Sequence, residues 1–133
     1  MIQEINVRTN SPVEMIDVTD SVLAVVNEKK VRNGYCIVFT PHTTAAVTIN
    51  ENADPDVPRD IISALEQAVP HNAHYRHREG NSPAHVKSSL VGTSEIIFIE
   101  NGRLVLGTWQ SIFFCEFDGP RSRRIIIKVV KTD

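Results

Sequence analysis

The chain has 133 residues, of which 41% are hydrophobic and 23% charged, and 14 basic residues stand against 16 acidic ones. This composition is typical of one globular domain with its own core, and it excludes a disordered tail. The net charge of −2 argues against a broad nucleic-acid surface, and no apolar run has the length of a membrane span. We therefore expect a single domain over 1–133 with neither a nucleic acid nor a membrane as partner.

The cysteines and the N-terminus predict the compartment. Cys36 and Cys115 each lie inside an apolar run and lack CxxC spacing, so they are expected to be buried free thiols. The opening segment MIQEINVRTN has no basic region followed by an apolar stretch, unlike an export signal. Both features favour a cytoplasmic protein.

The first third of the chain predicts two short strands and a helix. Residues 2–8 and 13–19 alternate imperfectly between apolar and polar side chains, and Ser11-Pro12 separates them. An apolar stripe of helical period then predicts a helix over 19–32. We expect Thr19 to be its N-cap, and Asn33-Gly34 to supply a left-handed C-cap.

The middle of the chain predicts two core strands and a second helix. Residues 35–40 form a continuous apolar run that is typical of a buried strand, and 45–50 is the expected partner. A helix over 55–69 follows, with Asp54 as its cap and Pro70 as its end.

The last third predicts strands. Periodicity does not decide whether 84–92 forms a short helical turn or an irregular approach to a strand. Asn101-Gly102 predicts a type I′ hairpin turn between 94–100 and 103–107. Two further strands are expected over 108–117 and 123–131. Seven or eight strands, two long helices and no regular βαβ alternation predict an α+β fold, with antiparallel or mixed sheets in a sandwich and the helices packed outside.

Histidines are the leading functional candidates. The polar run 71–85 carries four of the five in the chain and is expected to be a surface loop, and His42 lies in a separate loop between two core strands. Imidazoles of His42, His77 and His85 from two loops match a three-ligand zinc site with an open position. Because no HExxH or CxxC pattern is present, a metal site, an acid–base site and plain exposed histidines all remain open.

Asn50 and Glu116 are polar residues in expected core strands. Asn50 stands at the end of a buried strand, where polar residues commonly line a pocket. Glu116 follows an apolar strand that would turn it inward, so its carboxylate needs an arginine, a histidine or a metal as partner. His71 and His74 are expected to be bystanders.

A strand start and an arginine cluster are also candidates for ligand binding. Period-two alternation would place Thr108 and Gln110 on one face, while Trp109 packs on the other. Three arginines within four residues offer a local anion site or a solvated turn. They are Arg121, Arg123 and Arg124.

The segment from Ser94 to Gly102, followed by Gly107-Thr108-Trp109-Gln110, resembles the signature of the YjbQ family. Further segments that resemble the family are Pro41-His42-Thr43, Asn50-Glu51-x-x-Asp54-Pro55, Tyr75-x-His77, Ala84-His85-x-Lys87-Ser88-Ser89, and Glu116 ahead of Ser122-Arg123-Arg124.

The resemblance implies a compact sandwich that assembles as a homotrimer, with a site near a subunit boundary. It also implies a secondary thiamine-phosphate synthase activity, which joins a pyrimidine methyl diphosphate to a thiazole phosphate, usually with magnesium. The chain has no Asp-rich diphosphate motif that would support this chemistry independently. A metal- or anion-binding trimer without catalysis and a metal-dependent hydrolase therefore stay open as alternatives.

We expect the histidines that the resemblance selects to converge on a divalent metal, zinc or magnesium, or on an anion, in a pocket bordered by Glu116 and Gln110. The expected partner is a small phosphorylated molecule. The candidate catalytic residues are His42, His77, His85 and Glu116, of which the three histidines are also the candidate metal ligands. The candidate substrate-binding residues are Asn50, Asp54, Thr108, Gln110, Arg123 and Arg124.

Overall fold

The computed structural model describes residues 1–132, and in this range it contains eight strands and three helices. The strands are β1 (Ile2–Arg8), β2 (Glu14–Asp17), β3 (Gly34–Phe39), β4 (Ala45–Glu51), β5 (Ser94–Glu100), β6 (Arg103–Leu104), β7 (Gln110–Glu116) and β8 (Ser122–Lys131). The helices are α1 (Thr19–Lys29), α2 (Asp56–Ala68) and α3 (Ser82–Val91). None of these three helices combines the length and the hydropathy needed to cross a membrane.

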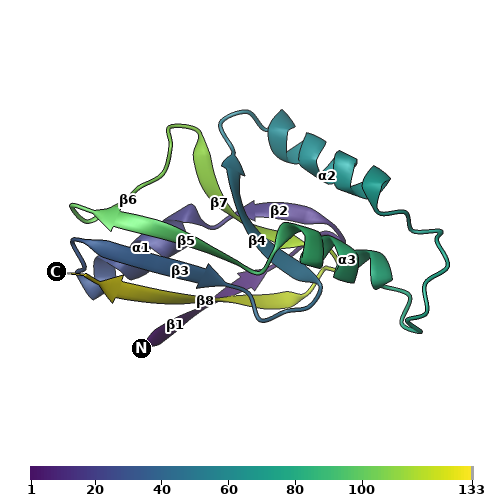
Figure 1. Cartoon of the computed structure of the whole chain (residues 1–133), viewed down its shortest axis with the longest axis horizontal. Helices are drawn as coiled ribbons and strands as arrows, with labels where there is room; N and C mark the ends of the chain where they lie inside the picture. Colours follow the sequence, from purple (N-terminus) through teal and green to yellow (C-terminus); the bar gives the residue numbers. More distant parts are fainter. Residues whose placement is uncertain (133) are drawn as a thin grey trace.

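The strands form two antiparallel sheets (Figure 1). The large sheet has the order β1-β8-β3-β5-β6, and the small sheet has the order β2-β7-β4. Every strand pairing within them is antiparallel. The expected α+β class is therefore confirmed, with three helices instead of the two long ones.

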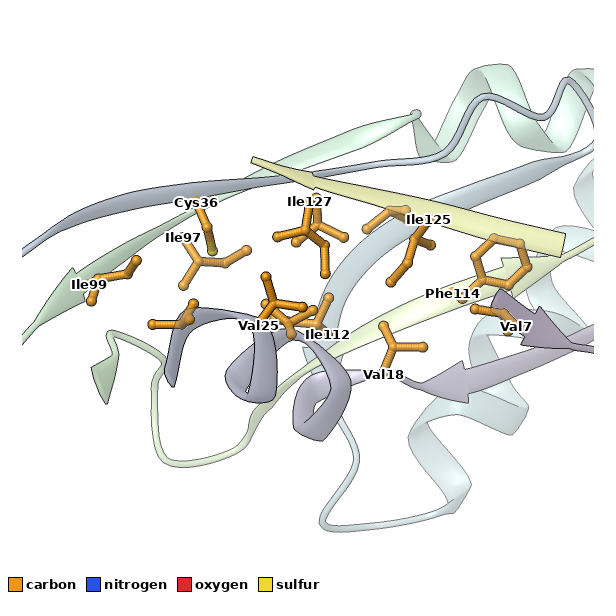
Figure 2. Close-up of a cluster of buried hydrophobic side chains, with 14 of the residues drawn as sticks. Val7, Val18, Val25, Cys36, Ile97, Ile99, Ile112, Phe114, Ile125 and Ile127 are labelled. Atoms are coloured by element: carbon orange, nitrogen blue, oxygen red, sulfur yellow. The ribbon is translucent and has the colours of Figure 1, made fainter. Parts of the chain in front are cut away.

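The main core lies between the large sheet on one side and the small sheet with α1 on the other (Figure 2). Alternation along β8 turns Ile125 and Ile127 inward, where both are fully buried, and α1 contributes Val22, Val25 and Val26. Burial of each such side chain contributes about 1.5–3 kcal/mol. This core fixes the relative position of the two sheets.

A second apolar cluster lies on the opposite face of the small sheet. Phe113 and Cys115 of β7 pack there with Ala84 of α3, while Ile112 and Phe114 of the same strand face the main core. Burial on both faces explains why this strand is a continuous apolar run. Both cysteines are free and buried, and burial raises the pKa of the Cys115 thiol to about 12.

The β5–β6 hairpin confirms the predicted turn. Asn101 and Gly102 have φ angles of 53° and 75°, and a type I′ turn requires positive φ at both central positions. β6 is shorter than expected, because regular pairing ends at Leu104.

Helix α1 is capped differently from the prediction. Thr19 is its first residue instead of its N-cap, and the Thr19 hydroxyl accepts a hydrogen bond from the backbone N–H of Ile112 at 2.8 Å. The left-handed residue that ends the helix is Lys30, with φ 55°, instead of the expected Asn33-Gly34. The chain thus leaves the helix before its apolar stripe ends.

The other two helices can be compared with the predicted cap at Asp54 and with the open question about residues 84–92. Asp54 stabilises the start of α2, because its carboxylate accepts the backbone N–H of Asp56 at 2.9 Å, although Pro55 occupies the cap position itself. The segment over 84–92 is largely helical, as part of α3, with Pro83 in the first turn. Figure 1 shows α2 and α3 on the same side of the small sheet.

The predicted strand start at Thr108 is wrong. Thr108 and Trp109 lie in a turn, and β7 begins at Gln110, whose side-chain oxygen accepts the backbone N–H of Gly107 at 2.8 Å. Trp109 is 62% exposed, so it does not pack in the core. Thr108 and Gln110 therefore do not share a strand face.

Candidate functional site

A cavity of about 370 Å³ lies where three connections meet: the β3–β4 loop, the α2–α3 loop with the first turn of α3, and the β7–β8 turn. These connections meet at the right-hand end of the molecule in Figure 1. The cavity is lined by Pro41, His42, Thr43, Thr44, His77, Glu79, Asn81, His85, Asp118, Arg121 and Arg123.

Arg123, one of the lining residues, belongs to a buried ion pair with Glu116, which does not itself line the cavity. Glu116 ends β7 in the small sheet, Arg123 lies near the start of β8 in the large sheet, and alternation turns both side chains inward. The Glu116 side chain is 0% exposed and the Arg123 side chain 5% exposed. Arg123 donates from Nε to Glu116 Oε1 at 2.9 Å and from Nη2 to Glu116 Oε2, so the pair links the two sheets.

The carboxylate of Glu116 accepts two further hydrogen bonds. Thr9 donates its hydroxyl to Glu116 Oε1 at 2.7 Å, and Asp118 donates its backbone N–H to Oε2 at 3.1 Å. Burial alone would raise the pKa of Glu116, but the hydrogen bonds from Arg123 and Thr9 outweigh it and hold that pKa below its usual range. Glu116 is therefore a fixed anion behind Arg123.

The β7–β8 turn depends on Gly119. A Cβ at this position would lie 2.4 Å from the backbone oxygen of Ser11 and 2.7 Å from Cγ of Glu116, so only glycine fits. The tight turn carries Asp118 and Arg121 to the edge of the cavity. There Arg121 donates from Nη2 to Asp118 Oδ2 at 2.8 Å.

His77 and His85 lie against each other. Their ring centroids are 5.2 Å apart and the rings are nearly perpendicular, at 89°. His77 belongs to the α2–α3 loop, whereas His85 belongs to α3, so the polar run predicted as one loop ends inside a helix. The helix gives His85 a fixed backbone position.

His42 is oriented by a neighbouring strand. The backbone N–H of Arg124 donates to His42 Nε2 at 3.1 Å, so in the neutral ring the proton is on Nδ1. Partial burial lowers the pKa of His42, and the positive charges of Arg123 and Arg124 lower it further, although Glu116 acts in the opposite direction. This imidazole is therefore neutral at neutral pH.

Other predicted residues lie away from this cavity. Asp54 and Thr108 are exposed and are not among its lining residues, and Asn50 lines a separate apolar cavity beneath α2. Gln110 and Glu116 are the two ends of β7, which at about 3.4 Å per residue separates them by about 20 Å. The expectation that Gln110 borders the pocket is therefore wrong.

The remaining predicted positions have structural contacts outside the cavity. The Arg124 side chain pairs with Glu4 at 2.6 Å, so Arg124 serves the site through its backbone. His71 contacts Glu66 at 2.7 Å, and His74 is exposed. Neither histidine lines the cavity, as we expected of bystanders.

Among the lining residues with charged or amide side chains, four were not in the predicted set of catalytic, metal-binding and substrate-binding residues: Glu79, Asn81, Asp118 and Arg121. The sequence did contain signals for them, because Glu79 and Asn81 belong to the polar run and Arg121 to the arginine cluster. Asp118 lies in the turn between the expected strands over 108–117 and 123–131. Periodicity could not show that this turn folds back over the end of the small sheet.

The site combines donors and acceptors that suit a small polar ligand. Arg121 and Arg123 offer N–H groups, Glu79 and Asp118 offer carboxylate oxygens, and the histidines can transfer protons. Among residues 1–132, no group of three or more His, Cys, Asp or Glu side chains has the arrangement of a metal site.

Comparisons with known proteins match almost the whole chain. Residues 3–132 match the family described as UPF0047 protein YjbQ-like. The chain is 48% identical over 130 residues to a UPF0047 protein of Methanocaldococcus jannaschii, covering 98% of this chain and 94% of the relative. It is also 48% identical over 131 residues to the UPF0047 protein YugU of Bacillus subtilis, covering 98% and 99%.

Solved structures show the same fold. An uncharacterized YjbQ/UPF0047 protein of Clostridium acetobutylicum superposes with a TM-score of 0.94 at 52% identity, over 96% of this chain and 99% of that one. A YbjQ-like protein of unknown function from Sulfolobus solfataricus also gives 0.94, at 31% identity, over 99% and 97%. The chain therefore belongs to the YjbQ/UPF0047 family.

Proposed function

We propose that this protein is an enzyme that acts on a small phosphorylated substrate in the three-histidine cavity. The leading activity is thiamine-phosphate synthase-like transfer, in which a diphosphate leaves as two ring systems are joined. The observation that carries the proposal is the buried Arg123, which is held by Glu116 and lines the same cavity as His42, His77 and His85. A cavity of about 370 Å³ is within the size range of small-molecule sites.

Arg123 supports the phosphate part of the proposal. Its hydrogen bonds to Glu116 and Thr44 use Nε and Nη2, so the N–H groups of Nη1 are available to a ligand oxygen. A guanidinium donates well to phosphate oxygens, and a group held by several hydrogen bonds needs little reorganisation when the ligand binds. Arg123 would therefore orient the phosphate.

The histidines support the enzymatic part. The neutral His42 ring offers an N–H at Nδ1, because its Nε2 accepts from Arg124. The rings of His77 and His85 are in edge-to-face contact, so one bound group could reach both imidazoles and exchange a proton with either. These side chains would assist the departure of the leaving group.

Turnover of a pyrimidine methyl diphosphate with a thiazole phosphate, followed by mass spectrometry of the product, tests this function. His85→Ala should lower kcat/KM by about 100-fold or more, the usual contribution of a general acid or base. His74→Ala is the matched control, because His74 is an exposed histidine of the neighbouring α2–α3 loop that does not line the cavity, and it should leave turnover unchanged. Absence of turnover in the wild-type protein, with magnesium supplied, would refute the transferase activity.

A divalent metal site is the second candidate, and one observation favours it. Two imidazoles bound to one tetrahedral zinc at about 2.0–2.1 Å place their ring centroids about 5 Å apart. The centroids of His77 and His85 are separated by 5.2 Å. His42 would join them only after its Nε2 releases the backbone N–H of Arg124. Elemental analysis of protein purified without a His tag decides between a bound metal and a metal-free site.

We also infer that the outer face of the large sheet binds further copies of this chain, as a homotrimer. Alternation along β5 buries Ile97 and Ile99 but leaves Ile96 and Phe98 60% and 66% exposed. Phe39 of the neighbouring β3 is exposed on the same face. Contiguous apolar side chains on a sheet face are typical of a subunit interface.

A further inference from the structure

The side chain of Asn81 lies in an unusual state beside the three-histidine cavity. Asn81 is the N-cap residue of α3, where an asparagine normally accepts a backbone N–H of the first helical turn through its side-chain oxygen. Here the side chain makes no capping hydrogen bond. It donates instead from Nδ2 to Asp118 Oδ2 at 2.8 Å.

This contact fixes the orientation of the amide. Rotating the amide by half a turn would place Oδ1 against the Asp118 carboxylate, where two acceptors would repel each other. Oδ1 is therefore the free end of the side chain. It is buried and accepts no hydrogen bond from residues 1–132, the one buried side-chain atom of this kind in that range.

A buried acceptor without a donor costs about 1–3 kcal/mol. The chain could avoid this cost if the amide capped α3, yet its Nδ2 end is held by Asp118 instead. Because Asn81 and Asp118 both line the cavity, a ligand bound there could supply the missing donor.

The charges of the cavity indicate which kind of donor. Arg123 is paired with Glu116 and Arg121 with Asp118, while Glu79 also lines the cavity and has no ion-pair partner among the described residues. Among the lining residues, the carboxylates of Glu79 and Asp118 equal the two arginines in number. A phosphate alone would therefore add negative charge to a balanced site, whereas an amino group on the same substrate would offset part of that charge.

We infer that the substrate is an amino-bearing phosphate, whose phosphate binds at Arg123 and whose amino group donates to Asn81 Oδ1. This inference rests on the proposed function, because it assumes the phosphate position. Asp118 and Glu79 supply further acceptors among the lining residues. Asn81 thus distinguishes substrates that carry a donor from those that carry only a phosphate.

Calorimetric titration with simple phosphates tests this inference without knowledge of the natural substrate. The probes are ethyl phosphate, 2-aminoethyl phosphate and 3-aminopropyl phosphate, so that two spacer lengths are covered. The wild-type protein should bind the better aminoalkyl phosphate about tenfold more tightly than ethyl phosphate, as expected for a hydrogen bond to a charged donor. Asn81→Ser, which keeps a good N-cap residue, should reduce this ratio to about one.

Asn72→Ser is the matched control, because Asn72 is an exposed asparagine of the same loop that does not line the cavity. It should keep the wild-type ratio. If circular dichroism shows that Asn81→Ser is unfolded, Asn81→Thr takes its place, since threonine also caps helices.

The other outcomes separate the two proposals. Equal binding of all three phosphates by the wild-type protein overturns the role of Asn81 and leaves the phosphate site standing. A preference that persists in Asn81→Ser also overturns it, because the donor then binds elsewhere. If none of the three phosphates binds, the proposed function fails and this inference fails with it.

Discussion

Glu116 and Arg123 form a buried ion pair, with side chains that are 0% and 5% exposed. Glu116→Gln would leave the Arg123 guanidinium buried without a counter-charge, which typically costs about 3–5 kcal/mol. We expect a loss of this size in the free energy of unfolding, measured by urea denaturation. Glu4→Gln is the control, because it breaks the half-exposed pair with Arg124 and should cost about 1 kcal/mol or less.

His42 should make stability depend on pH. Its pKa in the folded protein lies below the ordinary value of 6.5, so the unfolded chain takes up the proton first as the pH falls. The stabilisation that the neutral His42 ring contributes is therefore complete above pH 6.5. It is lost as the pH falls from there through the pKa of His42 in the folded protein.

Denaturation of wild type and His42→Gln at about pH 8 and about pH 5 measures this effect. The wild-type protein should lose more stability than the variant between the two pH values. The exposed His74→Gln should follow the wild type. An equal loss in wild type and His42→Gln would contradict the assigned role of this imidazole.

Helix α2 is held differently from the other elements. None of its side chains is buried, and Ile61, Ile62 and Leu65 line a cavity of about 300 Å³ between the helix and the small sheet. An ion pair links this helix to α3, between Glu66 and Lys87, whose side chain is 1% exposed. Few buried contacts mean that this helix should open locally before the sheets unfold.

Lys87→Met tests the contribution of the ion pair between Glu66 and Lys87. Methionine has a similar length and can pack beside Phe117, so the change removes the ion pair without leaving a buried charge. Hydrogen exchange followed by mass spectrometry should show faster exchange of α2 amides, while β7 and β8 keep wild-type rates. Arg59→Met, which removes an exposed pair within α2 itself, should change neither. Uniform acceleration across all elements would contradict local opening.

The elements show which parts of the fold the sequence could predict. The Asn101-Gly102 turn and the helix over 56–68 follow from local chemistry, since positive φ and an apolar period are properties of neighbouring residues. The end of α1 at Lys29 could not be predicted this way, because Val31 continues the apolar stripe although the chain has already left the helix. The exposure of Trp109 was not predicted, because the sequence indicates a strand from residue 108 whereas β7 begins at Gln110.

The site was only partly predictable for the same reason. His42, His77 and His85 stood out as residue types in a polar run and a strand loop, and the structure brings them to one cavity. The convergence of Asp118 and Asn81 depends on a contact between a turn and a helix start that are far apart in sequence. No local pattern contains that contact.

At the scale of the whole molecule, the apolar outer face of the large sheet predicts association. Light scattering should give a mass near three times 14.9 kDa. Phe98→Lys places a charge at the centre of the face and should shift the mass toward one subunit, because burying an unpaired charge is costly. Leu90→Lys, at a 64% exposed leucine on α3, is the control and should leave the mass unchanged. A wild-type monomer at micromolar concentration would refute the trimer.

The residues around the cavity differ in how freely they can change during evolution, because only some of them also link the two sheets. Glu116 and Arg123 link the two sheets, so a change at either one alone would lower the stability of the fold as well as alter the cavity. Glu79 and Arg121 line the same cavity from exposed positions, where substitutions cost little stability. New ligand preferences can therefore arise by mutation along the rim, one residue at a time, while the ion pair of Glu116 and Arg123 is inherited as a unit.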